Sequence, residues 1–194
     1  MKDSLQHTAQ QHWHKLDNEQ RRILLPAKDI LKRLDIARGM VLADVGCGIG
    51  YFALPAANML GEEGKVFALD VSDTMLEELS KRVMAEGLSN VIPMKIEHEK
   101  NPLETNSVDI ALLAFVLHEV NDPKTTLSEV HRVLLPKGRL AILEWDKKET
   151  PVGPPVNHRI DRAYVLDMLA ETDFVDIREI AIGENYYGIL AAKN

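Results

Sequence analysis

Short, continuous apolar runs alternate along this chain with longer segments of helical period. The runs are VLADV from residue 41, VFALDV from 66, VIPMKI from 91, VDIALLAF from 108 and RLAILEW from 139. Apolar runs without polar alternation are typical of strands buried on both faces of a parallel sheet. Because these strands alternate with helices, the sequence predicts a doubly wound α/β fold with helices on both faces.

Capping signals indicate where the helices begin. Ser72 precedes the amphipathic segment DTMLEELSKRVMAEG, and Asp122 precedes a second helical segment with Pro123 at its first position. Near the end of the chain, VDIREIAIG and YYGILAAKN are joined by a very short link. Such a link predicts an antiparallel hairpin at the C-terminal edge of the sheet.

Composition restricts the class of protein. The 194 residues suffice for one domain, and a net charge of −7 without a basic run argues against a nucleic-acid partner. Cys47 is the only cysteine, so no intrachain disulfide can form. The polar N-terminus lacks a signal-peptide core, and no apolar segment approaches the length of a membrane span. We therefore expect a cytoplasmic protein without integral membrane association.

We expect a helical extension at residues 1–35, followed by one sheet domain at residues 36–194. Within the extension, Ile23, Ile30 and Leu34 recur at helical spacing, which predicts a helix with one apolar face. The domain has little inserted material to cover a site. The extension and the proline-rich connection 147–160 are therefore the expected lid.

The sequence LADVGCGIGYF places Gly46, Gly48 and Gly50 directly behind the first apolar run. Ligands of doubly wound sheets bind beyond the carboxyl ends of the strands, where this loop lies. Glycine permits a sharp turn there and lets a ligand approach the backbone. The same pattern also suits a strand-to-helix turn without a ligand, so the loop alone leaves both interpretations open.

Two aspartates narrow the choice of ligand. Asp70 ends the second apolar run, where a carboxylate accepts hydrogen bonds from ribose hydroxyls; Ser72 is better placed to cap the helix that follows. Asp44 precedes the glycines, where it repels a pyrophosphate and attracts an ammonium or sulfonium. The G-x-G-x-G spacing, with Tyr51 where a dinucleotide site has glycine, also disfavours a nicotinamide cofactor. S-adenosylmethionine fits this charge pattern.

The segments VLADVGCGIGYFALP, VFALDVSDTML, NSVDIALLAFVLHEV and LLPKGRLAILEW resemble the successive motifs of class I S-adenosylmethionine-dependent methyltransferases. The resemblance is greatest to the branch of ubiquinone and menaquinone biosynthesis, and it includes the lead-in segment LDNEQRRILLP. It implies a Rossmann-like seven-stranded sheet with an antiparallel last strand. It also implies methyl transfer to a small-molecule acceptor by in-line displacement, without naming that acceptor.

The resemblance implies that cofactor-binding residues come from three of these motifs and from the loop after the third apolar run. They are Asp44, Gly46, Cys47, Gly48, Gly50, Asp70, Val71, Met75, Glu97, His98 and Ala114. Asp44 would face the ammonium, Asp70 the ribose hydroxyls and Ala114 the sulfonium. Val71 and Met75 would flank the adenine, with Glu97 and the N–H of His98 at its edge. Glu97 stands where this family usually has aspartate.

His118 and Glu119 follow the fourth apolar run, and we expect them at the rim of the active site as candidate catalytic residues. A general base is needed only if the acceptor arrives protonated. A solvated or helix-capping role is the alternative for His118. Arg159, after the proline-rich connection, would either hold an anionic group or begin a surface helix. His12 and His14 belong either to a lid or to a solvated helix face.

Two other functions stay open at this point. One is a nicotinamide-dependent oxidoreductase with an unusual glycine loop, and the other is a non-catalytic domain that keeps the cofactor fold to bind a partner. No cluster of histidine, cysteine and carboxylate has the spacing of a closed metal site, so we expect no metal. A homodimer is compatible with the sequence.

Overall fold

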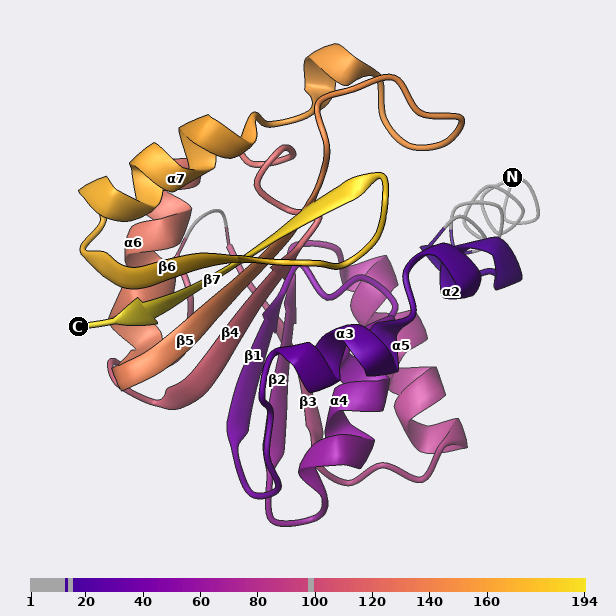
Figure 1. The fold of residues 1–194 in the computed structure, drawn as a ribbon. Coiled ribbons are helices and arrows are strands. Elements are labelled where there is room, and N and C mark those ends of the chain that lie inside the picture. Colours follow the sequence, from indigo (N-terminus) through magenta and orange to yellow (C-terminus); the bar gives the residue numbers. More distant parts are fainter. Residues whose placement is uncertain (1–12, 14–15, 98–99) are drawn as a thin grey trace.

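A seven-stranded sheet lies at the centre of the computed structural model, which describes residues 13, 16–97 and 100–194 (Figure 1). The strands are β1 (Val41–Val45), β2 (Lys65–Asp70), β3 (Val91–Lys95), β4 (Val108–Ala114), β5 (Leu134–Trp145), β6 (Phe174–Ile180) and β7 (Tyr186–Lys193). Their order is β3-β2-β1-β4-β5-β7-β6. The first five strands pair in parallel, whereas β7 is antiparallel to both β5 and β6. The predicted mostly parallel sheet with an antiparallel hairpin is confirmed. The hairpin consists of β6 and β7, and β6 forms the edge of the sheet opposite β3.

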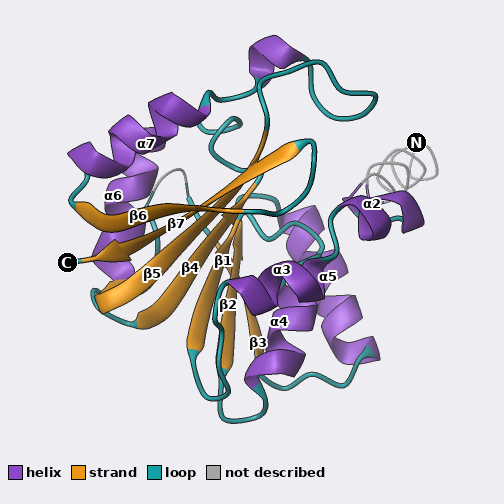
Figure 2. Ribbon diagram, in the orientation of Figure 1, coloured by secondary structure: helices purple, strands orange, loops and turns teal. Residues whose placement is uncertain are grey.

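Helices cover both faces of this sheet (Figure 2). They are α2 (Glu19–Leu24), α3 (Ala27–Arg33), α4 (Ala53–Leu60), α5 (Asp73–Ala85), α6 (Pro123–Val133), the short 3-10 helix η1 (Val156–His158) and α7 (Arg162–Glu171). The helices α3, α4 and α5 lie on one face, and α6 and α7 on the other (Figures 1 and 2). Each face has its own apolar core, with Leu112 of β4 in one and its neighbour Leu113 in the other. This alternation explains why the strand sequences are apolar throughout.

The predicted caps are present. Ser72 Oγ accepts a hydrogen bond from the backbone N–H of Met75, and Asp122 Oδ1 accepts one from that of Thr125. Pro123 occupies the first position of α6. These caps fix where α5 begins after β2 and where α6 begins after the loop that follows β4. Both helix starts lie near the candidate site.

The N-terminal extension differs from the prediction of one amphipathic helix. Pro26 separates α2 from α3, because proline lacks the N–H that a continuing helix needs. The predicted apolar face is therefore not continuous: Ile30 of α3 is buried, whereas Ile23 of α2 is 72% exposed. His12 and His14 lie outside the described residues. Across the described ranges, no helix combines the length and apolarity needed to cross a bilayer.

Candidate cofactor and acceptor site

The glycine loop between β1 and α4 is tied to the neighbouring strand. The backbone N–H groups of Gly46 and Cys47 both donate to the carbonyl of Leu69, over 2.7 and 2.9 Å. Gly46 has a φ of +73°, and a Cβ there would lie 2.5 Å from Val116 Cγ2. Glycine at this position therefore allows the left-handed backbone and a close approach to the turn after β4.

Gly50 has a different role from Gly46. A Cβ on Gly50 would lie 2.5 Å from Leu79 Cδ1 of α5, so this glycine permits close packing of the loop against α5. Cys47 is buried in the same loop. Burial raises the pKa of the Cys47 thiol, and this keeps it in the neutral, weakly nucleophilic form.

Asp70 joins the end of β2 to the glycine loop. One carboxylate oxygen accepts the backbone N–H of Gly48 over 2.8 Å, and the other accepts that of Ser72 over 2.9 Å. Each carboxylate oxygen has a second lone pair, so Asp70 can still accept hydrogen bonds from a diol. Asp70 is 8% exposed and lines a cavity.

Asp44 is buried with one oxygen lacking a partner. The carboxylate is 2% exposed and accepts the backbone N–H of Ala53. Its Oδ2 atom has no hydrogen-bond partner within the described part of the chain. Burial, and then the charge of Asp70, raises the pKa of Asp44 to about 7. An unpartnered carboxylate of this kind fits a cationic ligand group and disfavours a phosphate.

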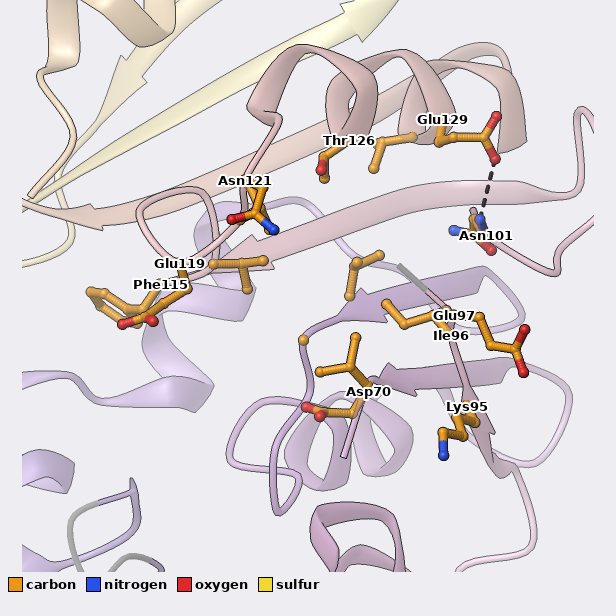
Figure 3. A pocket seen from close by; sticks show the side chains of 16 residues that line it. Asp70, Lys95, Ile96, Glu97, Asn101, Phe115, Glu119, Asn121, Thr126 and Glu129 are labelled. Carbon is orange, nitrogen blue, oxygen red and sulfur yellow. Dashed lines mark hydrogen bonds between the residues drawn. The ribbon is translucent and has the colours of Figure 1, made fainter. Parts of the chain in front are cut away.

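A cavity of about 720 Å³ opens at the carboxyl ends of β1, β2 and β4 (Figure 3). Its charged side chains are mainly acidic: among the described lining residues, Asp70, Glu97, Glu119 and Glu129 carry carboxylates and Lys95 is the one cation. Glu129 also pairs with Arg132, outside the lining, over 2.9 Å. Figure 3 shows Asp70 and Glu97 on one side of the cavity, with Glu129 opposite on α6. This acidic lining is suited to a ligand with positive charge.

The cavity brings together some of the predicted residues. Gly46, Asp70, Val71 and Glu97 line it. Met75 and Ala114 are partly buried outside its wall, and His98 lies outside the described residues. The other predicted residues, which also lie outside the wall, are Asp44, Cys47, Gly48 and Gly50. The contacts that the resemblance implies for all these residues stay predictions.

Phe115, which the sequence analysis missed, lies directly after β4. Its φ of +63° is unusual for an aromatic residue, and its backbone N–H is held by the carbonyl of Leu143 over 2.8 Å. Such backbone strain persists where the surrounding structure imposes it, often at functional sites. Phe115 lines the acidic cavity and also a second cavity.

His118 is held behind the cavity rather than in its wall. Its Nδ1 atom lies 2.8 Å from Glu144 Oε2, and its Nε2 atom lies 3.2 Å from Glu119 Oε1. The Glu144 side chain is fully buried, and the sequence analysis did not identify it. Burial opposes the charged imidazole, but the hydrogen bond and charge of Glu144 outweigh burial and raise the pKa of His118. Glu119 itself lines the cavity.

The second cavity, of about 450 Å³, lies between α2 and the end of β5. Its aromatic wall consists of Phe115, Trp145 and Tyr186, whose ring centroids are 4.6 to 5.7 Å apart. Val152 and Gly153 close it from the proline-rich connection. Aromatic walls of this kind suit a flat organic molecule.

Arg159 is buried rather than at the start of a surface helix, and its guanidinium donors are engaged by the protein, which argues against the predicted role of holding an anionic group. It is 4% exposed, and its guanidinium binds the connection that precedes it. The acceptors are the carbonyls of Asp146, Lys148, Val152 and Pro154 and the hydroxyl of Thr150. Because the donors are engaged, Arg159 fixes the loop that closes the second cavity.

Comparison with known proteins adds to this geometry. Residues 43–142 match a family model described as a methyltransferase domain. A demethylmenaquinone methyltransferase of Geobacillus stearothermophilus is 37% identical over 124 residues, which are 64% of this chain and 53% of that protein. A ubiquinone/menaquinone biosynthesis C-methyltransferase of Cronobacter sakazakii is 33% identical over 69% of this chain and 52% of its own length. The chain thus spans about half the length of these curated relatives.

Among solved structures, a SAM-dependent methyltransferase from Aquifex aeolicus superposes with a TM-score of 0.88. It is 34% identical, and the match covers 93% of this chain and 96% of that one. The similarity therefore extends over nearly the whole length of both chains.

Proposed function

Because the chain belongs to the methyltransferase domain family, we propose that it transfers a methyl group from S-adenosylmethionine to a small organic acceptor by in-line displacement. The predicted class I fold and its resemblance to the ubiquinone and menaquinone branch are confirmed by the sheet topology and the relatives. The oxidoreductase alternative receives no support from these relatives.

The observation that carries the proposal is the negative charge in and beside the cavity. Asp44 is not a lining residue, but it directly precedes Val45 and Gly46, which are. Asp44 leaves one buried oxygen without a partner, and the cavity lining is mainly acidic. A cofactor with an ammonium and a sulfonium satisfies both features, whereas a pyrophosphate would be repelled. The residues present therefore fit S-adenosylmethionine, which supplies a methyl group activated on its sulfonium.

The chain would contribute binding and alignment. Gly46 lets the ligand approach the backbone, Asp44 attracts its ammonium, and Asp70 holds the ribose hydroxyls. Phe115 separates the acidic cavity from the aromatic one, where the acceptor would lie. Alignment and exclusion of water are the main requirements of such a displacement.

A quinone precursor is one proposed acceptor, and the names of the relatives support it. The aromatic wall of the second cavity also fits a flat ring. For acceptors that arrive protonated, we assign Glu119 as the group that receives the proton, with His118 behind it. Glu119→Gln should then slow such acceptors and shift their pH profile, while Glu62→Gln, on a surface loop, should not.

The proposal is tested by incubating the chain with S-adenosylmethionine and a panel of small phenols, quinols, carboxylates and amines. Formation of S-adenosylhomocysteine above the acceptor-free rate supports it, provided that Asp70→Ala abolishes the gain. Binding of S-adenosylhomocysteine without turnover of any acceptor would favour the non-catalytic alternative.

A further inference from the structure

The two cavities that meet at Phe115 carry opposite charge. The first is lined mainly by carboxylates, whereas the second contains no Asp or Glu among its described lining residues and one cation, Arg21. In a chain with a net charge of −7, a cavity without carboxylates is a distinct local environment. It points to a ligand whose charge differs from that of the cofactor.

Arg21 of α2 is held against aromatic rings. Its guanidinium carbon lies 4.7 Å from the ring centroid of Tyr51 and 5.4 Å from that of Phe115. Its Nε atom is buried and makes no hydrogen bond within the described residues. Burial lowers the pKa of Arg21, as expected for a cation removed from water without an adjacent counter-ion.

The acidic group whose charge acts on Arg21, Asp17, is already engaged. Asp17 pairs with Arg22 over 2.8 Å and with Arg82 over 2.9 Å, so its carboxylate is shared by two other guanidinium groups. No ion pair to Arg21 occurs among the residues that the structure describes. A buried cation without a carboxylate partner is costly unless a ligand supplies the negative charge.

We propose that Arg21 recognises an oxyanion on the methyl acceptor, and that the acceptor is a planar organic anion such as an aromatic carboxylate or phenolate. This inference rests on the proposed function and names the substrate class of that site. The ring of the acceptor lies against Trp145 and Tyr186, and its oxyanion pairs with the guanidinium of Arg21, which lines the cavity. An acceptor that arrives ionised needs no general base, so neither Glu119 nor His118 has to receive a proton from it.

A purely structural Arg21 is the alternative to exclude. In that case the guanidinium would only brace α2 against Tyr51 and Phe115, and the cavity would not distinguish a charged ligand from a neutral one. Anion recognition and a purely structural role can be distinguished by comparing the affinities of two probes that have the same shape but different charge. We choose 2-naphthoate and its neutral amide, 2-naphthamide.

The experiment measures binding of both probes by calorimetry to the chain saturated with S-adenosylhomocysteine. Wild-type protein should bind naphthoate at least about tenfold more tightly than naphthamide, since a hydrogen bond to a charged group has roughly that effect. Arg21→Gln should abolish the preference without changing the affinity for naphthamide or S-adenosylhomocysteine. Arg22→Gln, which alters an exposed neighbour on the same helix, should keep the preference, and Arg21→Lys should keep part of it.

Equal binding of the two probes, no binding of either probe, or an unchanged preference in Arg21→Gln would overturn the inference. Unchanged binding of S-adenosylhomocysteine shows that the variant is folded and that the cofactor site is intact. If the wild-type chain does not bind S-adenosylhomocysteine at all, the proposed function itself fails, and this result is distinguishable from loss of the anion preference alone.

Discussion

The backbone N–H of Gly48 donates to the carboxylate of Asp70 over 2.8 Å, and this hydrogen bond connects the glycine loop to the end of β2. The same carboxylate holds the N–H of Ser72, the N-cap of α5. Asp70 therefore orders two backbone segments and also faces the cavity. A single carboxylate links the shape of the loop to the proposed ribose contact.

Replacing Asp70 with alanine should weaken both cofactor binding and the stability of the fold. We expect at least about tenfold lower affinity for S-adenosylhomocysteine, and a free energy of unfolding lower by about 1–3 kcal/mol, because the Gly48 N–H loses its acceptor. Calorimetry and urea unfolding measure the two effects. Glu77→Ala, which removes an exposed carboxylate from α5, should leave the affinity unchanged. Undiminished affinity of Asp70→Ala would refute the ribose assignment.

Gly46→Ala should be more damaging than Gly87→Ala. Both glycines have positive φ, but a Cβ on Gly87 meets no atom within 4 Å, whereas one on Gly46 lies 2.5 Å from Val116 Cγ2. Gly87→Ala should cost about 1–2 kcal/mol from backbone strain. Gly46→Ala should cost about 1–3 kcal/mol more from overpacking and should also lose S-adenosylhomocysteine binding. Equal unfolding midpoints for the two variants would contradict the close approach at Gly46.

The raised pKa of Asp44 predicts a specific pH dependence of stability. The folded pKa of about 7 exceeds the ordinary value of 3.8, so the folded chain binds more protons than the unfolded chain between these values. The Asp44 contribution should therefore decline as pH rises from about 4 to about 7, by up to a few kcal/mol at about 1.4 kcal/mol per pKa unit. Asp44→Asn should flatten this decline in urea unfolding across that range. An identical pH dependence in the two proteins would show that the pKa of Asp44 is not raised in the folded chain.

The ionisation of Asp44 should also make cofactor affinity depend on pH. Ionised Asp44 attracts an ammonium, so affinity for S-adenosylhomocysteine should increase from pH 5.5 to pH 8 in the wild-type chain. Asp44→Asn should bind more weakly at pH 8 and lose most of this increase.

Arg159→Met should loosen the connection over the second cavity. The side chain is buried and binds loop carbonyls, so its loss should lower the free energy of unfolding by about 1–3 kcal/mol and expose residues 147–155 to limited proteolysis. Arg162→Met removes a partly exposed arginine from the start of α7 and should have a smaller effect. Affinity for S-adenosylhomocysteine should stay unchanged in both. Protease resistance equal to wild type would contradict the role assigned to Arg159.

The sheet, its caps and part of the cofactor cavity followed from local sequence patterns. Apolar runs, the cap at Ser72 and the glycine loop act over a few neighbouring residues, so they can be predicted without tertiary contacts. The same holds for Asp70, whose position at the end of β2 fixes its direction relative to the glycine loop.

Other features depend on contacts between distant segments. Arg21 and Arg22 are adjacent and chemically identical, and only the packing of α2 against Tyr51 and Phe115 determines which is buried. Arg159 lies where a surface helix was expected, and its burial depends on the path of the preceding connection. Glu144 could have been identified from the sequence, because it is a single carboxylate inside the apolar run LAILEW.

The central claim is that the acidic cavity binds an adenosyl cofactor that carries positive charge and no phosphate. Calorimetric titration of the purified chain with S-adenosylhomocysteine and, separately, with NADH tests it most directly. We predict saturable binding of S-adenosylhomocysteine and no detectable binding of NADH. Binding of NADH in preference to S-adenosylhomocysteine would contradict the roles assigned to Asp44 and to the glycine loop.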